Sequence, residues 1–378
     1  MTIYFDVSAA VHARSGLGRY AESLLNALGA ARPVTLFYNR DATIRELAGA
    51  AARPRQTISA GYKRWRMQVW LGQLLGLRFN HLLPGATLYH ATEHLLMPLP
   101  GIPTVLTVHD LIFARFPRFH KPLNYIFLNL AVPLFCRRAD AIIAVSESTR
   151  QDLIAYYHID PAKITVIYEA ASPKFTPQPQ AVIDAARQRY RLPDRYLLTV
   201  CVIEPKKNHI GFLQAFEQLA RSTPDLYWVI VGSKGWLYEK FFTALESSPA
   251  RDRVILPGYI RDEDLAAVYG GAETFVFPSL CEGFGLPPLE AMACGAPVAC
   301  SNSSSLPQIC GRAAQYFDPR SAAHMAHAVQ RVLADKTRQE AMSRLGLEQA
   351  GRFSWQRAAD ETWALYQSLI AHAKGMKK

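Results

Sequence analysis

Short apolar runs alternate along the chain with longer segments in which apolar residues recur at every third or fourth position. The short runs indicate buried strands, and the recurrence indicates helices with one buried face. Their alternation predicts parallel strands joined by crossover helices. In the first half the predicted strands are 2–7, 34–38, 87–91, 104–109, 141–145 and 165–168, and the predicted helices are 17–28, 62–77, 122–138 and 147–157.

A segment dense in proline interrupts this pattern between Ser172 and Pro179. Proline continues neither a helix nor a central strand, so the segment is predicted to be a linker. The alternation then resumes. In the second half the predicted strands are 196–202, 226–231, 254–256, 274–278, 297–300 and 315–317, and the predicted helices are 210–220, 236–245, 262–268, 288–294, 322–334 and 336–350.

Two similar halves predict an α/β protein with two Rossmann-like, doubly wound domains, over residues 1–172 and 173–353. Because ligands bind outside the C-terminal ends of the strands in such sheets, the domains are expected to face each other across a cleft. Ser354 is a good N-cap for a last helix within residues 354–378. That segment could pack on the second domain or cross back to the first, and the sequence does not decide between them.

The chain has 378 residues, half of them hydrophobic, which is enough for two cores. Its formal net charge of +11 favours anionic partners, such as nucleic acid, an acidic bilayer or phosphorylated ligands. The sequence contains no zinc-finger, RNP-like or basic-zipper pattern, so nucleic-acid binding is not indicated.

The six cysteines form no C-x-x-C pair, and a structural metal site is therefore not expected. Several lie in apolar surroundings, which is typical of free thiols in a reducing compartment. The N-terminal segment Met1–Val7 lacks a basic region ahead of a long apolar run and is predicted to be a strand, not a signal peptide. A membrane-spanning segment is not expected either, so the sequence predicts a cytoplasmic protein.

The segment from Phe277 to Gly295 carries the strongest chemical signal. A strand is predicted to end near Pro278, a loop with Gly283 and Gly285 follows, and Pro288 suits the first turn of a helix. Glycine lets the backbone approach a ligand closely, and free amides at a helix start attract anions. Glu282, in the loop, and Glu290, expected in the first helical turn, are natural acceptors for sugar and ribose hydroxyls. The segment therefore predicts a site for a molecule with phosphates and many hydroxyls.

This segment resembles the E-x7-E region of the retaining family 4 glycosyltransferases, which have the GT-B fold. The resemblance extends over nearly the whole chain. It is carried by further motifs in order: Gly16-Leu17-Gly18-Arg19-Tyr20, Val108-His109-Asp110-Leu111, Val145-Ser146-Glu147-Ser148-Thr149, Glu204-Pro205-Lys206-Lys207-Asn208, Val231-Gly232-Ser233-Lys234-Gly235-Trp236 and Ser304-Ser305-Leu306-Pro307. The family implies a transferase that moves a sugar from a nucleotide diphosphate, with retention, to an acceptor.

The family also implies roles for individual residues. Glu282 would hold donor-sugar hydroxyls, and Glu290 would hold the ribose. Lys207, with help from Lys206, would neutralise the diphosphate as the leaving group gains charge, since fixed cations aimed at developing negative charge lower a barrier. The remaining donor contacts would come from the loop and from the segment beside the nucleotide base: Gly283, Phe284, Gly285, Leu286, Tyr259 and Ile260.

A metal cofactor is not expected if the lysines and the helix start stabilise the diphosphate. Asp262-Glu263-Asp264 imitates the D-x-D metal motif of other glycosyltransferases. Acidic residues are favoured at a helix start on capping grounds alone, so this run is interpreted as a cap.

In the first half, His109 is expected at the C-terminal end of a strand, where it could donate to the donor sugar or a phosphate as a third catalytic residue beside Glu282 and Lys207. A buried structural histidine is the alternative. Gly16 and Gly18 lie between the first predicted strand and helix and could let the backbone meet the diphosphate or the reacting sugar.

Four alternatives stay open for the function. Within the family, the runs at 232–236 and 304–307 look most like mannosyltransferases of surface polysaccharide assembly (lipopolysaccharide or exopolysaccharide), which implies GDP-mannose as donor and a lipid-linked or oligosaccharide acceptor; a UDP-hexose is the second choice. A sugar-nucleotide-binding protein without turnover and a sugar-nucleotide epimerase are rivals. Glu282 and Glu290 could also flank a glycosidic bond in a hydrolase, but a phosphate site has no use there.

Residues 62–78 form a basic, aromatic and apolar stretch, and Pro117–Lys121 adds further basic and aromatic residues. The first stretch is predicted to form an amphipathic helix of the kind that lies at a membrane surface. It would let the first domain rest on an anionic bilayer, as a peripheral protein on the inner face of the cytoplasmic membrane. An ordinary helix with a cationic outer face is the alternative.

Overall fold

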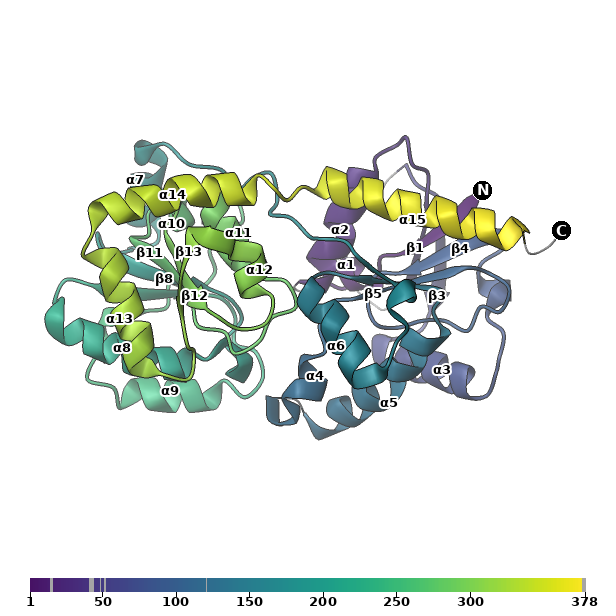
Figure 1. The fold of residues 1–378 in the computed structure, drawn as a ribbon, viewed down its shortest axis with the longest axis horizontal. Helices are drawn as coiled ribbons and strands as arrows, with labels where there is room; N and C mark the ends of the chain where they lie inside the picture. The colour runs from purple at the N-terminus through teal and green to yellow at the C-terminus, as the bar shows by residue number, and fades with distance from the viewer. Residues whose placement is uncertain (14–15, 41–43, 48, 51, 120, 376–378) are drawn as a thin grey trace. The chain divides into compact units, whose positions relative to one another are not determined.

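The structure is a computed structural model that describes residues 1–13, 16–40, 44–47, 49–50, 52–119 and 121–375. The chain forms two compact units (Figure 1). Unit 1 comprises Met1–Glu169 and Ser354–Lys378, and unit 2 comprises Ala170–Phe353. Unit 1 is therefore built from two separate stretches of sequence, and each unit has its own sheet.

Unit 1 contains a seven-stranded sheet in which all paired strands run parallel, in the order β3-β2-β1-β4-β5-β6-β7. The middle strands are buried on both faces, which explains why they read as continuous apolar runs. The strands are β1 Thr2–Asp6, β2 Thr35–Arg40, β3 Arg55–Ser59, β4 Ala86–Ala91, β5 Thr104–Val108, β6 Ala141–Ala144 and β7 Ile164–Val166.

Helices cover this sheet, and the C-terminal helix α15 lies along α2 (Figure 1). Ser354 caps α15, because its hydroxyl accepts a hydrogen bond from the amide of Arg357 at 3.0 Å. The buried Tyr366 of α15 is hydrogen-bonded to His90 of β4. The helices are α1 Ser8–Val11, α2 Leu17–Leu28, α3 Tyr62–Leu74, α4 Ile112–Arg115, α5 Pro122–Arg138, α6 Glu147–Tyr157 and α15 Trp355–Gly375.

Unit 2 contains a six-stranded sheet, also parallel throughout its paired strands, in the order β10-β9-β8-β11-β12-β13. Its largest buried side chain is Trp228, whose indole N–H donates to Thr199 Oγ1 at 3.0 Å and so stays satisfied in the core. The strands are β8 Tyr196–Val200, β9 Tyr227–Val231, β10 Val254–Ile255, β11 Thr274–Phe277, β12 Val298–Ser301 and β13 Ala314–Phe317.

The helices of unit 2 lie on the two faces of its sheet (Figure 1). They are α7 Gln180–Arg189, α8 His209–Ser222, α9 Glu239–Glu246, α10 Leu265–Gly270, α11 Leu286–Ala293, α12 Leu306–Cys310, α13 Ala322–Leu333 and α14 Lys336–Ala350. Short 3-10 turns in the two units span Asn80–Leu82, Pro117–Phe119, Pro161–Lys163, Pro205–Lys207, Arg251–Arg253 and Gly311–Ala313.

The predicted fold class is confirmed, since both sheets are parallel and helix-covered. Among the strands and α-helices, five elements were not predicted: β3, α1, α4, α7 and α12. The strand β3 is polar and half exposed, and the only apolar residues of α7 larger than alanine are Val182 and Ile183, so neither element shows a clear period. The helix starts expected at 236, 262 and 288 lie instead at Glu239, Leu265 and Leu286.

Within the described part of the chain, no helix is long and apolar enough to cross a membrane. The six cysteines are all free thiols, and five of them are buried.

Candidate functional site

The loop that follows β11 forms the centre of the candidate site in unit 2. It leads from Phe277 at the end of the strand to Gly285, the N-cap of α11. Gly285 has a φ of 112°, a backbone conformation that favours glycine, and a Cβ there would meet the side chain of Leu306 at 2.7 Å. The glycine is therefore required by the turn and by close packing, and it directs the loop into the start of the helix.

Glu282 and Lys207 meet inside this loop. The Lys207 Nζ lies 2.6 Å from Glu282 Oε1, and both side chains are about nine-tenths buried. The Ser279 hydroxyl also donates to Glu282 Oε1, and the ring of Phe277 lies 4.9 Å from Lys207 Nζ. The two predicted catalytic residues of unit 2 thus form one charge-assisted pair, although they lie 75 positions apart in the sequence.

A set of serines holds the loop in place. The Ser304 hydroxyl accepts the amide hydrogen of Glu282 at 2.8 Å. The Ser305 hydroxyl lies 2.6 Å from the carbonyl oxygen of Phe284 and 3.1 Å from that of Glu282. Ser301 donates to the Ser279 carbonyl at 2.6 Å. These bonds fix the backbone that carries Glu282, and the sequence analysis missed all but the run containing Ser304 and Ser305.

Glu290 lies in the same unit, two residues further from the start of α11 than predicted. The helix begins at Leu286, so Glu290 is its fifth residue and not part of the first turn. Its side chain is buried, and Oε2 accepts a hydrogen bond from the Tyr269 hydroxyl at 2.9 Å. Tyr269 belongs to α10 and is a further site residue, which no local sequence pattern distinguishes.

Lys206 and Lys207 occupy a 3-10 turn that precedes α8, and their side chains make different contacts. Lys206 Nζ lies 3.5 Å from Glu204 Oε1, and its carbonyl accepts the amide hydrogen of Leu280 at 2.8 Å. Burial raises the pKa of the Glu204 carboxyl, and the charges of both lysines oppose that shift. The turn is thereby tied to the Glu282 loop through backbone as well as side chains.

The two residues expected beside a nucleotide base differ in exposure. The Tyr259 side chain is 83% exposed, whereas Ile260 is buried in the core of unit 2. Exposure leaves the Tyr259 ring accessible to a planar ligand.

The acidic run 262–264 does not cap α10 as interpreted from the sequence. Asp264 is the N-cap residue but makes no capping hydrogen bond with its side chain. It accepts instead from Tyr190 at 2.6 Å and from Arg189 at 2.9 Å, and Asp262 pairs with Lys174. Among the described residues, no group of three or more metal-ligating side chains is found.

In unit 1, the glycines near α2 have different surroundings. Gly16 is the N-cap of α2 with a φ of 67°, and a Cβ there would enter open space. Gly18 lies inside α2, and its Cβ would approach the Ala9 carbonyl oxygen of α1 to 2.7 Å. Close contact between α1 and α2 therefore explains why residue 18 is a glycine. Only Gly16 lies before α2, as predicted for both glycines.

His109 follows β5 at the C-terminal end of the sheet in unit 1. Its Nδ1 lies 3.2 Å from Glu169 Oε1, and its Nε2 lies 2.9 Å from the Thr92 carbonyl oxygen. The ring of Tyr20 packs edge-on against it at 4.7 Å. Burial is the largest single effect and lowers the pKa of His109, but Glu169, the Thr92 carbonyl and Asp110 together raise it above its ordinary value.

Asp6 and Thr92 complete a polar edge that the sequence analysis did not select. The Asp6 carboxylate accepts from the Tyr89 hydroxyl at 2.6 Å and from the Ser8 amide at 2.8 Å. The Thr92 hydroxyl donates to the Asp6 carbonyl at 2.7 Å. Burial raises the pKa of Asp6 to about 6. The available signal was position, because Asp6 and Thr92 end or follow strands β1 and β4.

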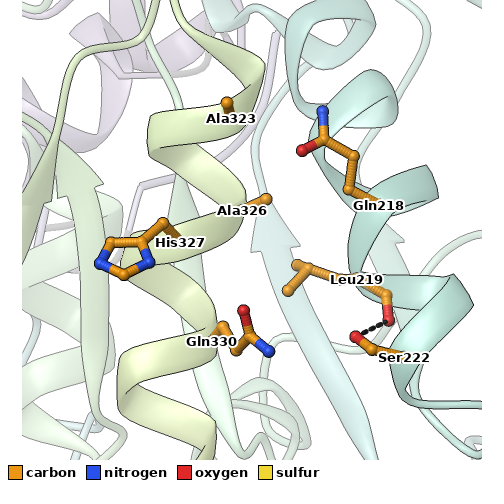
Figure 2. A pocket seen from close by; sticks show the side chains of 7 residues that line it. All are labelled: Gln218, Leu219, Ser222, Ala323, Ala326, His327 and Gln330. Atoms are coloured by element: carbon orange, nitrogen blue, oxygen red, sulfur yellow. Dashed lines mark hydrogen bonds between the residues drawn. The ribbon is translucent and has the colours of Figure 1, made fainter.

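Two surface hollows are lined by other residues. One of about 180 Å³ lies between α8 and α13, where Leu219 and Ala326 lie between the two helices (Figure 2). The other, of about 470 Å³, lies in unit 1 and is lined by residues from Gln73–Arg78, Leu96–Thr104, Arg138, Asp140 and Ala373. Neither includes a residue predicted for the site.

Two family models match the chain. The model described as "Glycosyltransferase Family 4" matches residues 14–174, and "Glycosyl transferases group 1" matches residues 183–349. The first range contains the strands β2–β7 of unit 1, and the second contains all six strands of the unit 2 sheet together with the whole Glu282 loop.

Relatives and solved structures agree with this assignment. The chain is 29% identical to the O-antigen chain mannosyltransferase B of Escherichia coli over 98% of its own length and 100% of that protein. Its fold is shared with the sucrose-phosphate synthase of Thermosynechococcus elongatus, with a TM-score of 0.77 and 21% identity over 98% and 100% of the two chains. The structure of Anabaena HepE in complex with UDP and glucose gives a TM-score of 0.77 and 17% identity over 97% and 100%. The chain therefore belongs to the group 1, family 4 glycosyltransferases and has the GT-B fold.

Proposed function

We propose that this protein transfers a mannosyl group, with retention, from GDP-mannose to a lipid-linked or oligosaccharide acceptor in the assembly of a surface polysaccharide. The buried pair formed by Lys207 and Glu282 carries the donor site in this proposal. The likeness to the O-antigen chain mannosyltransferase of Escherichia coli over the full chain supports the choice of mannose. A UDP-hexose is the alternative donor, supported by the fold shared with HepE, whose structure contains UDP and glucose.

In unit 2, each part of the donor has a matching group. Lys207 and Lys206 would neutralise the diphosphate, and the amides of Gly283–Leu286 at the start of α11 would add to the positive potential there. Glu282 would accept from sugar hydroxyls and Glu290 from the ribose. Tyr259 and Ile260 would lie beside the base. In this scheme the positive charge that neutralises the diphosphate leaving group comes from the two lysines. Transfer is therefore expected to proceed after treatment with a metal chelator.

We assign no covalent nucleophile, and the proposed route is a displacement on one face of the sugar. The departing diphosphate oxygen takes the proton of the acceptor hydroxyl as the new glycosidic bond forms. Lys207 stabilises the charge that develops on that oxygen, which is the kind of electrostatic contribution that is largest when the cation is fixed in advance. The serine contacts of the Glu282 loop supply such fixing.

A panel of sugar nucleotides tests the donor. GDP-mannose is expected to raise the melting temperature most, because a ligand that binds only the folded state stabilises it. Transfer is then measured with oligosaccharide and lipid-linked acceptors, and the anomeric configuration of the product is determined by NMR. A shift with UDP-glucose but not with GDP-mannose would replace mannose by the alternative. Binding without nucleotide release on any acceptor would favour a non-catalytic binding protein, and conversion of the donor without acceptor would favour an epimerase.

We also propose that unit 1 docks on an anionic bilayer through the exposed sides of α3 and α5, called here the α3–α5 surface. The two helices touch, because the Arg66 guanidinium lies 4.0 Å from the Phe127 ring centre and donates to Asn124 at 3.2 Å. Along their outer sides, large apolar side chains recur at three- and four-residue spacing and are exposed: Met67, Leu71 and Leu74 on α3, and Leu123, Ile126 and Leu130 on α5.

The charge of the α3–α5 surface is of one sign. Neither 62–78 nor 117–138 contains an aspartate or a glutamate, whereas Lys63, Arg64 and Lys121 are exposed beside the apolar side chains. An anionic bilayer suits this surface, because the apolar side chains can enter the headgroup region and the cations can contact acidic lipids. A second copy of this positively charged chain suits it less, because its charge has the same sign. The outer leucines and isoleucine also have no packing reason to be apolar in a free monomer.

Sedimentation with vesicles tests this docking. Binding is expected to vesicles that contain phosphatidylglycerol and to be weaker with pure phosphatidylcholine. The double substitution L123S/I126S should reduce binding, while V182S, at an exposed position in unit 2, should not. Equal binding to both vesicle types would remove the electrostatic part of the proposal. Dimerisation in solution that L123S/I126S abolishes would identify the surface as an interface between copies instead.

A further inference from the structure

The hydrogen-bond partners of His109 restrict its protonation state. The partner of Nε2 is the Thr92 carbonyl oxygen, at 2.9 Å, which carries no hydrogen and can only accept. The partner of Nδ1 is the Glu169 carboxylate, at 3.2 Å, which also accepts when ionised. With Glu169 ionised, both ring nitrogens must carry hydrogen for both bonds to form, and a histidine with two N–H groups is an imidazolium cation.

His90, on the adjacent strand β4, shows the contrast. Its ring nitrogens contact the hydroxyls of Tyr366 and Thr107, which can donate or accept. These partners suit a neutral ring. Burial, together with the charge of His109, lowers the pKa of His90 to about 3. The two neighbouring histidines thus have opposite environments, set by acceptor-only partners in one case and hydroxyls in the other.

The other elements packed around His109 add to its charge balance. Glu169 follows β7 and is buried, and Asp110 is the next residue along the chain. From α2, Tyr20 presents its ring edge-on and contributes no ionised group, since burial raises its pKa. Against burial, Glu169, Thr92 and Asp110 together raise the pKa of His109. Its side chain keeps 12% of its surface exposed, enough for a ligand to approach.

We infer that Glu169 is a positioning residue that fixes the His109 ring and keeps it an imidazolium, so that His109 presents a permanent positive charge at the C-terminal edge of the unit 1 sheet. This inference rests on the proposed function for its role in transfer. It excludes His109 as a general base, because the ring has no free lone pair. It also makes the contribution of His109 electrostatic, directed at an electron-rich oxygen of the substrate.

Nitrogen NMR of the full chain with labelled histidine tests the charge state directly. The H109Q variant assigns the signals, which are followed from about pH 5 to about pH 9. Wild-type His109 is expected to stay doubly protonated above the ordinary midpoint of about 6.5. E169Q should move the midpoint below that value, and E169D should give an intermediate midpoint. E361Q, at a half-exposed carboxylate of α15 that pairs with Arg357, is the matched control and should leave the His109 midpoint unchanged.

The pH dependence of kcat/KM provides the second readout. Since His109 must stay charged, E169Q is expected to lose at least about tenfold in kcat/KM at pH 8 relative to pH 6, while E361Q follows the wild type. An ordinary His109 midpoint that E169Q does not change would overturn the inference, even if transfer is observed. A raised midpoint in a protein that transfers no sugar would leave the charge state standing and reject the proposed function. If E169Q fails to fold, the His109 midpoint in E169D still tests the inference, because a midpoint equal to that of the wild type would overturn it.

Discussion

Lys207 and Glu282 form a buried ion pair in unit 2, with 2.6 Å between Nζ and Oε1. The two groups that we propose to hold the diphosphate and the sugar of the donor therefore neutralise each other when no donor is bound. A nucleotide sugar brings an anion for Lys207 and hydroxyls for Glu282 in one molecule. It can replace both halves of the pair at once, whereas inorganic phosphate would satisfy Lys207 alone and leave Glu282 without its cation.

Breaking this pair from one side should destabilise the protein. K207M leaves the Glu282 carboxylate buried without a cation, and we expect it to lower the free energy of unfolding by about 3 kcal/mol. In the double variant K207M/E282Q no unpaired charge remains, so the loss should be smaller than the sum of the two single losses by about 2 kcal/mol. Urea unfolding of the four proteins measures this coupling.

The control for this cycle is the exposed pair Arg344–Glu348 on α14 of the same unit. R344M removes one cation from an ion pair in water and should change the free energy of unfolding by less than about 0.5 kcal/mol. Additive losses for Lys207 and Glu282 would show that their contact contributes nothing to stability.

Tyr269 should influence donor binding although we propose no contact between it and the donor. Its hydroxyl donates to Glu290 Oε2 at 2.9 Å and so orients the carboxylate assigned to the ribose. Y269F is expected to weaken donor binding about tenfold, equivalent to about 1.4 kcal/mol. Titration calorimetry with the nucleoside diphosphate measures the change. Y238F, at a tyrosine of the same unit outside the site, serves as the control, and equal affinities in the two variants would reject the role of Tyr269.

The two glycines near α2 should respond differently to alanine. In G18A the new Cβ would lie 2.7 Å from the Ala9 carbonyl oxygen, so α1 and α2 must separate, at a cost of about 1–3 kcal/mol. In G16A the side chain meets open space, and only the backbone conformation opposes it. A φ of 67° with a ψ of −75° is strained for any residue that has a Cβ, at a cost of about 1–3 kcal/mol. Thermal unfolding measures both losses, and a G18A protein as stable as wild type would contradict the packing explanation.

Asp6 should make the stability of unit 1 depend on pH. Its folded pKa of about 6 lies above its ordinary value of 3.8, so the folded state binds this proton more tightly than the unfolded state. The stabilisation is fully present below about pH 4 and is lost as the pH rises to about 6, with a total near 3 kcal/mol. D6N has no such proton. Urea unfolding at several pH values measures the free energy of unfolding of both proteins. Between about pH 4 and pH 6 the wild type should lose stability relative to D6N, and above this interval the difference should stay constant.

The sequence predicted the strands that are buried on both faces, because these are the strands that appear as continuous apolar runs. It did not predict β3, in which exposed and half-buried residues alternate and Arg55 opens the strand. The short helices α1, α4 and α12 were missed for another reason: with four or five residues each, they are too short to show a period. Helix starts were misplaced by two or three residues where proline or acidic residues suggested a cap, as at Pro288 and Asp262.

For the candidate site, the sequence selected residue types but not their partners. Glu282 and Lys207 were both predicted, yet nothing local shows that they touch, since a contact across 75 positions depends on how β8 and β11 pair. Tyr269 and Glu169 were missed because a tyrosine in a helix and a glutamate after a strand are common in any fold. Serines 301 and 303, which bind the Ser279 carbonyl, lie in a polar run that resembles an ordinary loop.

The return of the last helix to unit 1 has a consequence for biosynthesis. On the ribosome, residues 1–169 emerge first but lack α15, whose Tyr366 covers His90 and whose Trp355 contacts Tyr20. All seven strands of the unit 1 sheet lie before residue 167, but the helix that contacts Tyr20 and His90 is translated only after unit 2. Until residues 355–375 are translated, the apolar side chains that α15 covers along α2 stay exposed in the nascent chain, and exposed apolar surface of this kind favours aggregation.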